Sequence, residues 1–254
     1  MIVPASIEHY ETLLRDREPF TLSNIGGDGE FLTIVGWNGT NSDGKTSTPE
    51  KQAALARCIL EPRSTYHGYN PGTPGSKKQS DAEAWLRSHG VNVPAYFPSY
   101  IDDAGFGGAK TNVRWVHKEI IAGANCQGRL GPFLGLLRAR KPLVIGPTWL
   151  APMAQRLNAN ASYLVPPEVG WESLDTLEAK IRAVLSALPA DGVVTWSLGY
   201  LTKVLQWRLI PDYPWLTQID LGAVLDPYCG HRNRRFYKSD KWPAAMESNL
   251  AGMA

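Results

Sequence analysis

The chain has 254 residues, of which 43% are hydrophobic and 20% are charged, and its formal net charge is +2 at pH 7. These values are typical of a globular domain with a sizeable core, and the near-neutral charge gives no overall electrostatic reason to expect a nucleic-acid partner. The first residues lack the basic and apolar regions of a signal peptide. No apolar run reaches the roughly 18 residues of a membrane span. The cysteines are widely spaced and form neither a disulfide framework nor a zinc motif. We therefore expect a cytoplasmic protein without a membrane partner.

The first 140 residues contain several helix signals separated by loops rich in glycine and proline. Ser6 can cap a first helix, and Thr48 can cap a second one that has Pro49 at its first position. The further elements expected in this half are a strand at 20–23, a loop at 61–79, a helix opened by the Ser80–Glu83 capping box and ending at His89, a strand at 91–97, a loop at 99–110 and a helix from Asn112.

From Lys141 onward, buried-type strands and amphipathic helices alternate regularly. Strands are expected at 142–145, 161–165, 192–196 and 216–220, and helices at 149–157, 173–188 and 197–207. Such alternation is typical of a parallel sheet covered by helices on both faces. The sequence therefore predicts a Rossmann-like, mostly parallel α/β fold forming a single domain over residues 1–254, with a basic and aromatic C-terminal segment at 231–254.

Two carboxylates follow the first expected strand in the stretch Asn24–Phe31, which reads Asn-Ile-Gly-Gly-Asp-Gly-Glu-Phe. Its glycines allow a tight turn and a close approach of backbone to a ligand. Asp28 and Glu30, one residue apart, are suited to a hard divalent cation that is shared with phosphate oxygens. A solvated Asp-Gly turn is the alternative that the same residues allow.

Three motifs in order give this chain a family resemblance. Gly27-Asp28-Gly29-Glu30, Thr195–Gly199 and Ile219–Gly222 resemble the motifs of glycosyltransferases of the GT-D fold, and together they span nearly the whole chain. Two positions depart from the family pattern, because no arginine precedes Gly27 closely and Ala223 stands where the family often has histidine. The chain is most similar to an uncharacterised, phage-type branch.

The resemblance implies a metal-assisted, inverting enzyme that uses Mn²⁺ or Mg²⁺ and moves a sugar from a nucleotide donor of the UDP type to a hydroxyl acceptor. DNA, protein and glycan all stay open as acceptors, and a phage-encoded enzyme would work in the host cytoplasm. The resemblance also implies a short helix at residues 31–37, where propensity alone favours a strand, and we adopt the helix.

Four loops are expected at the carboxyl ends of strands, where open parallel sheets bind ligands. Their hydroxyls and free amides suit phosphate oxygens, and Asp220 can accept a hydrogen bond from a sugar or ribose hydroxyl. A plain strand-to-helix turn is the alternative for each loop. The predicted donor-binding residues are Asn24, Gly27, Gly146, Pro147, Thr148, Ser197, Leu198, Gly199, Asp220 and Gly222.

An inverting transfer also needs a general base to take the proton of the acceptor hydroxyl. The sequence does not choose among Asp102, Asp103, Asp226 and His117, and Glu30 can serve if Asp28 alone binds the metal. The residues that we predict to be catalytic are Asp28, Glu30, Asp103 and Asp226.

Two other functions compete with this hypothesis. Gly39–Thr46 matches the P-loop pattern of ATPases and kinases, but the next helix is expected only at Pro49, whereas a P-loop leads directly into its helix. The basic and aromatic C-terminal segment instead suits single-stranded nucleic acid, or a DNA acceptor.

Overall fold

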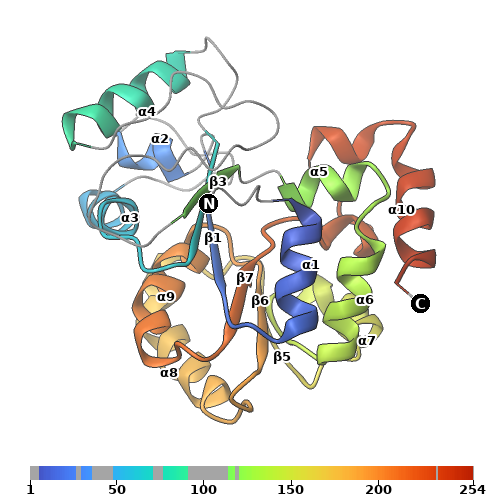
Figure 1. The fold of residues 1–254 in the computed structure, drawn as a ribbon. Coiled ribbons are helices and arrows are strands. Elements are labelled where there is room, and N and C mark those ends of the chain that lie inside the picture. Colours follow the sequence, from blue (N-terminus) through green and yellow to red (C-terminus); the bar gives the residue numbers. More distant parts are fainter. Residues whose placement is uncertain are drawn as a thin grey trace.

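The computed structural model describes residues 6–26, 30–35, 48–70, 77–90, 114–117, 120–232 and 234–253. Within them, seven strands form one parallel sheet in the order β3-β2-β1-β7-β6-β4-β5 (Figure 1). This confirms the predicted Rossmann-like α/β architecture. The strands are β1 (Thr21–Gly26), β2 (Tyr66–Asn70), β3 (Arg114–His117), β4 (Leu143–Pro147), β5 (Ala161–Val165), β6 (Val193–Trp196) and β7 (Thr217–Asp220).

Helices cover both faces of the sheet. One core lies between the sheet and a group that includes α3, α8 and α9, and the other lies between the sheet and a group that includes α1, α6 and α7 (Figure 1). The helices are α1 (Ile7–Asp16), α2 (Glu30–Ile34), α3 (Pro49–Leu60), α4 (Lys77–Ser88), α5 (Ile120–Cys126), α6 (Gly131–Arg140), α7 (Ala151–Arg156), α8 (Leu174–Leu185), α9 (Tyr200–Leu209) and α10 (Trp242–Ala251), with short 3₁₀ turns η1 (Thr148–Leu150), η2 (Trp171–Ser173), η3 (Ile210–Asp212), η4 (Asp226–Cys229) and η5 (Arg235–Lys238).

Local signals explain many of these elements. The Ser6 side chain accepts a hydrogen bond from the His9 amide, and Thr48 accepts one from Lys51, so both predicted caps are confirmed. In β4, Leu143 and Ile145 lie in the core under α8 and α9, whereas Val144 lies in the opposite core. Because both faces are buried, this strand is a continuous apolar run. The short helix that the resemblance implied at residues 31–37 is present as α2, which spans Glu30–Ile34.

Three expectations in the first half are wrong. Residues 66–70, expected within a loop, form β2, which pairs with β1 along its whole length, and residues 114–117, expected in a helix, form β3. In β2, pairing with the neighbouring strands overrides the weak local signal of a sequence that contains glycine and asparagine. The helix expected from Ser80 to His89 is present as α4, but it begins at Lys77, so the capping box expected at Ser80 is wrong. The strand expected at 91–97 and the loop at 99–110 lie outside the described residues.

The C-terminal segment is part of the packed structure. Tyr237 and Trp242 are buried, and α10 packs on α5 and α6. Asn249 donates hydrogen bonds to Asn125 and to the Tyr228 hydroxyl, and its side-chain oxygen accepts the Leu130 amide at 2.7 Å. These two aromatic rings are therefore core residues, and this argues against the alternative in which they contact nucleic acid.

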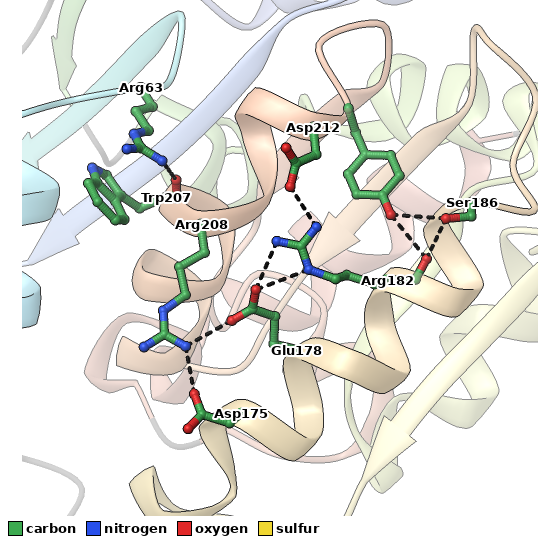
Figure 2. A network of polar contacts seen from close by, with 9 residues as sticks. Arg63, Asp175, Glu178, Arg182, Ser186, Trp207, Arg208 and Asp212 are labelled. Atoms are coloured by element: carbon green, nitrogen blue, oxygen red, sulfur yellow. Dashed lines mark hydrogen bonds and ion pairs between the residues drawn. The ribbon is translucent and has the colours of Figure 1, made fainter.

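A network of charged side chains fastens α8 to α9 on the outside of the molecule. Figure 2 shows Glu178 between Arg182 and Arg208, while Asp212 also contacts Arg182 and Asp175 also contacts Arg208. The distances from the Glu178 oxygens to the arginine nitrogens are 2.8 to 3.0 Å. The network holds the outer side of α9, whose inner side faces the sheet.

Candidate functional site

Three neighbouring strands end at the same level of the sheet. Ile145 of β4 lies opposite Trp196 of β6, and Trp196 lies opposite Asp220 of β7. The turns after these strands border a cavity of about 290 Å³. The predicted residues that line it are Pro147, Ser197, Leu198, Gly199, Gly222 and Asp226. The structure therefore brings together residues from three separate stretches of the sequence.

The turn after β6 has a backbone that requires glycine. Gly199 has φ +58° and ψ −133°, a conformation that other residues rarely adopt, and α9 begins directly after it. The Leu198 amide donates to the Thr202 hydroxyl at 2.8 Å, and the Ser197 amide donates to the carbonyl of Ile145. Both amides thus donate hydrogen bonds within the chain and are not available to a ligand. A ligand in the cavity would instead contact the Ser197 hydroxyl and the Gly199 backbone.

Gly146 and Thr148 occupy different positions beside this cavity. A Cβ atom on Gly146 would lie 2.6 Å from Leu150 and 3.2 Å from Ser197, so this glycine allows β4 to pack against both turns. Thr148 begins η1 and is exposed. Its neighbours Pro147 and Trp149 line the cavity.

Asp220 and Asn24 join the ends of β7 and β1. The Asp220 carboxylate accepts hydrogen bonds from the amides of Asn24 and Gly222, both at 3.0 Å, and forms an ion pair with Lys203 of α9. The Asn24 side-chain amide donates to the Asp220 carbonyl at 2.7 Å. Asp220 is only 1% exposed. Its carboxylate therefore holds the strand ends together from within, and its direct contact with a sugar hydroxyl stays a prediction.

Glu30 is the first residue of α2 and the described member of the carboxylate pair. Its side chain is 13% exposed, and its Oε1 lies 3.9 Å from the Lys203 ammonium. Gly27, Asp28 and Asp103 lie outside the described residues, as does Asp102. In the part of the chain that is described, no group of three or more His, Cys, Asp or Glu side chains could hold a metal.

Asp226 begins η4 and lines the cavity. It is 9% exposed, and its Oδ1 accepts a hydrogen bond from the Trp149 indole at 3.0 Å. The Trp149 ring stacks on His231 at 4.5 Å between ring centroids. Burial raises the pKa of Asp226, although the Trp149 hydrogen bond and the nearby His231 and Arg234 act in the opposite direction. A buried carboxyl group with a raised pKa is suited to proton transfer.

Two residues of this region, Lys203 and Trp149, were not predicted from the sequence. Lys203 lies in the apolar run Leu201–Leu205, and a lysine on the buried side of a helix was the signal that could have revealed it. Trp149 directly follows the predicted loop 146–148, but its contact with Asp226 depends on the fold. His117 ends β3, and only its backbone is described.

No protein-family model matches this chain, and no curated protein matches it significantly. A solved structure of a glycosyltransferase of domain family DUF1792 from Streptococcus sanguinis matches 88% of this chain and 82% of its own, with a TM-score of 0.56 and 16% identity. A second DUF1792 structure gives a TM-score of 0.58 at 13% identity, and a third, described as having a distinct glycosyltransferase fold, gives 0.51 at 12%. Each of these covers 88% of this chain and 79% of the other.

The chain has this glycosyltransferase fold. At such identities the likeness concerns the architecture, and it confirms the GT-D arrangement expected from the three motifs. It gives no support to a phage-type branch. Among the described helices, none is both long and apolar enough to cross a membrane.

The P-loop match at Gly39–Thr46 lies outside the described residues. The helix that follows is described, and its cap is Thr48, with Pro49 as the first helical residue. A P-loop lysine and threonine open their helix directly. The helix therefore begins three residues after the motif ends at Thr46, as expected from the sequence, and this offset argues against a P-loop.

Proposed function

We propose that this protein is a glycosyltransferase that moves a sugar from a nucleotide donor to a hydroxyl acceptor. The observation that carries the proposal is the cavity at the carboxyl ends of β4, β6 and β7, which is built from predicted donor-binding turns within a glycosyltransferase fold. In open parallel sheets this edge is where ligands bind.

The donor would lie in this cavity, with its diphosphate toward the Ser197–Gly199 turn and the end of β1. Apolar side chains that include Val165, Pro166 and Val169 line the wall and suit a base or the apolar face of a sugar. A nucleotide of the UDP type is the proposed donor. Asp28 and Glu30 would hold Mn²⁺ or Mg²⁺, which would neutralise charge on the leaving diphosphate.

The acceptor hydroxyl would lose its proton to a carboxylate, for which Asp226 is the described candidate. The oxygen forms a bond to the anomeric carbon as the bond to the diphosphate breaks, and the proton passes to Oδ2 of Asp226, while Trp149 holds Oδ1. A single displacement of this kind inverts the anomeric centre. Asp103 stays a predicted second candidate for the base, and DNA, protein and glycan stay open as acceptors.

A panel of radiolabelled nucleotide sugars, offered with Mn²⁺, with Mg²⁺ and with a chelator, tests this function. We expect metal-dependent release of the nucleoside diphosphate from one donor, and loss of that release in Asp28→Asn and Glu30→Gln variants that remain folded. Lys45→Ala should keep its activity, because the P-loop function would need this lysine. Release of phosphate from ATP that depends on Lys45 and not on Asp28 would contradict the proposal.

A further inference from the structure

A groove of about 510 Å³ lies where the ends of α6, α7 and α10 come together, and this size suits a small-molecule ligand. Figure 1 shows α10 beside α6, and the two helices are in contact. Arg138 shortly precedes β4 and Asn158 shortly precedes β5, so the groove lies toward the edge of the sheet opposite the candidate active site. Its described lining residues are Arg138, Gln155, Arg156, Asn158, Leu250 and Met253, and none of these lines the other cavity.

Two arginines bring positive charge to this groove. Arg138 and Arg156 lie in the last turns of α6 and α7, both are exposed, and within the described ranges neither forms an ion pair. Arg140 in the same turn of α6 differs, because it lies 3.6 Å from Asp191 and donates to the Leu14 carbonyl at 2.7 Å. Like charges that line one groove repel each other, and an anion bound between them would remove that repulsion.

The remaining lining residues are neutral and of two kinds. Gln155 and Asn158 carry amides that both donate and accept hydrogen bonds, which suits hydroxyl groups. Asn158 has φ +50°, a left-handed conformation that asparagine adopts more readily than most residues. Leu250 is half-buried and Met253 is buried, so they give the groove an apolar surface. The described lining thus combines cations, amides and apolar groups, and it includes no carboxylate.

Close packing holds the walls of the groove in place. A Cβ atom on Gly131 would lie 2.7 Å from the Cα atom of Gly252, and one on Gly135 would lie 3.3 Å from the Met253 carbonyl oxygen, so α6 and the end of α10 are in tight contact. On the side of α7, Met153 and Leu157 are fully buried. A ligand would therefore have to order little more than the exposed polar side chains, which favours binding.

We propose that this groove binds a small phosphate monoester of a sugar. Such a monoester carries close to two negative charges at pH 7, which matches the guanidinium groups of Arg138 and Arg156 in charge and in hydrogen-bond geometry. Gln155 and Asn158 would bind the sugar hydroxyls, and Leu250 and Met253 would contact the apolar face of the ring. No residue of the candidate active site takes part, so the proposal is independent of the proposed function.

Calorimetry on the wild-type protein at low ionic strength gives the first test, with glucose-6-phosphate as the probe. We expect saturable binding of one sugar phosphate per chain, no measurable binding of glucose, and binding of inorganic phosphate that is weaker by about fivefold or more, because inorganic phosphate leaves the amides and the apolar surface unused. Absence of saturable binding would overturn the proposal. Equal affinity for inorganic phosphate would indicate an adventitious ion only and would overturn it too.

Variants assign the binding to the groove. We expect Arg138→Gln and Arg156→Gln each to weaken binding of the sugar phosphate by roughly tenfold, the effect of losing a charge-assisted hydrogen bond. Gln155→Ala should weaken binding of the sugar phosphate and leave binding of inorganic phosphate unchanged. Arg57→Gln, at an exposed arginine of α3 on the other face of the sheet, is the matched control and should bind as wild type does. All four positions are exposed, so urea unfolding should show folded variants. Folded arginine variants that bind normally would overturn the proposal.

Two competitors separate this groove from other places where phosphate could bind. UDP tests the proposed donor cavity, and we expect an excess of UDP to leave binding of the sugar phosphate unchanged. Displacement by UDP would place the sugar phosphate in the donor cavity and would overturn the proposal. A short single-stranded oligonucleotide offers phosphate diesters, and we expect it to compete weakly. Tighter binding of the oligonucleotide that depends on Arg138 and Arg156 would identify a polymer as the ligand and would likewise overturn the proposal.

Discussion

Helix α9 carries positive charges in two environments, and they have different consequences. On its inner side Lys203 is buried against Asp220, and on its outer side Arg208 is about one-third exposed and contacts Asp175 and Glu178 (Figure 2). A buried ion pair becomes costly when one partner is removed, because the other charge stays in the interior. An exposed pair contributes little, because water screens it. Ion pairs on the same helix therefore differ in their effect. The buried pair supports the candidate site, whereas the exposed pairs contribute little to stability.

Removing one charge of the inner pair should have the largest effect. We expect Lys203→Met to lower the free energy of unfolding by roughly 3–5 kcal/mol, because Asp220 stays buried without its cation. Urea unfolding at pH 7 measures this loss. Lys180→Met, on the exposed side of α8, should change stability by less than about 0.5 kcal/mol. Equal stability of the two variants would mean that Asp220 is sufficiently stabilised by the amides of Asn24 and Gly222.

Asp226 is a buried carboxylate that, unlike Asp220, has the neutral indole of Trp149 as its direct partner. We expect Asp226→Asn to lose roughly a hundredfold or more in the rate of sugar transfer to an acceptor, the usual contribution of a general base. Because burial raises the pKa of Asp226, wild-type activity should fall on the acid side at a higher pH than an ordinary aspartate would give. A pH–rate profile measures this limb, and an unchanged profile in the variant would contradict the role.

The same raised pKa predicts the stability of this variant. The folded state binds the Asp226 proton more tightly than the unfolded chain does, so this group favours the fold at low pH, and that contribution is lost as the pH rises through the folded pKa. At pH 7 the buried, ionised carboxylate of Asp226 therefore lowers the stability of the folded state. We expect Asp226→Asn to be at least as stable as wild type in urea at pH 7, and a clear loss of stability would instead indicate a structural role.

Asn249 provides a buried network without charge. Its side chain makes hydrogen bonds to Asn125, Tyr228 and the Leu130 amide, and these bonds connect α10 to α5 and η4. We expect Asn249→Ala to lower the free energy of unfolding by roughly 2–3 kcal/mol, because buried partners lose their bonds. Ser248→Ala, at the exposed neighbouring position, is the control and should cost less than half as much. The same comparison shows whether the C-terminal segment folds with the sheet.

The half of the fold from β4 to β7 was predictable because its signals are local. Leu143–Ile145 is a continuous apolar run, and Leu174, Leu177, Ile181 and Leu185 are spaced for one face of a helix. The strand β2 carries no such signal, since Gly68 and Asn70 are poor strand formers, and it depends on pairing with β1. Helix α10 was missed for a related reason, because its apolar residues pack on α5 and α6 without a clear helical period.

The candidate site also has a part that was predictable from the sequence and a part that was not. The turns at Pro147, Ser197–Gly199 and Gly222 were predictable, because each follows a recognisable strand and the carboxyl ends of parallel strands share one edge. The role of Asp220 was not, because its carboxylate pairs with Lys203 of α9 and accepts the Asn24 amide from the distant end of β1 as well as the nearby Gly222 amide. A motif indicates that a carboxylate is present, whereas the fold decides what it contacts.

Removing a charge from the outer network should have the smallest effect. Glu178 accepts hydrogen bonds from Arg182 and Arg208, yet both arginines are about one-third exposed and each has a second carboxylate partner, Asp212 and Asp175 respectively. We therefore expect Glu178→Gln to lower the free energy of unfolding by less than about 1 kcal/mol and to leave diphosphate release unchanged. Urea unfolding at low salt and in roughly 1 M NaCl measures this, and the difference from wild type should shrink in salt because exposed charges are screened. A loss as large as that of Lys203→Met would mean that the outer network holds α9 in place as firmly as the buried pair does.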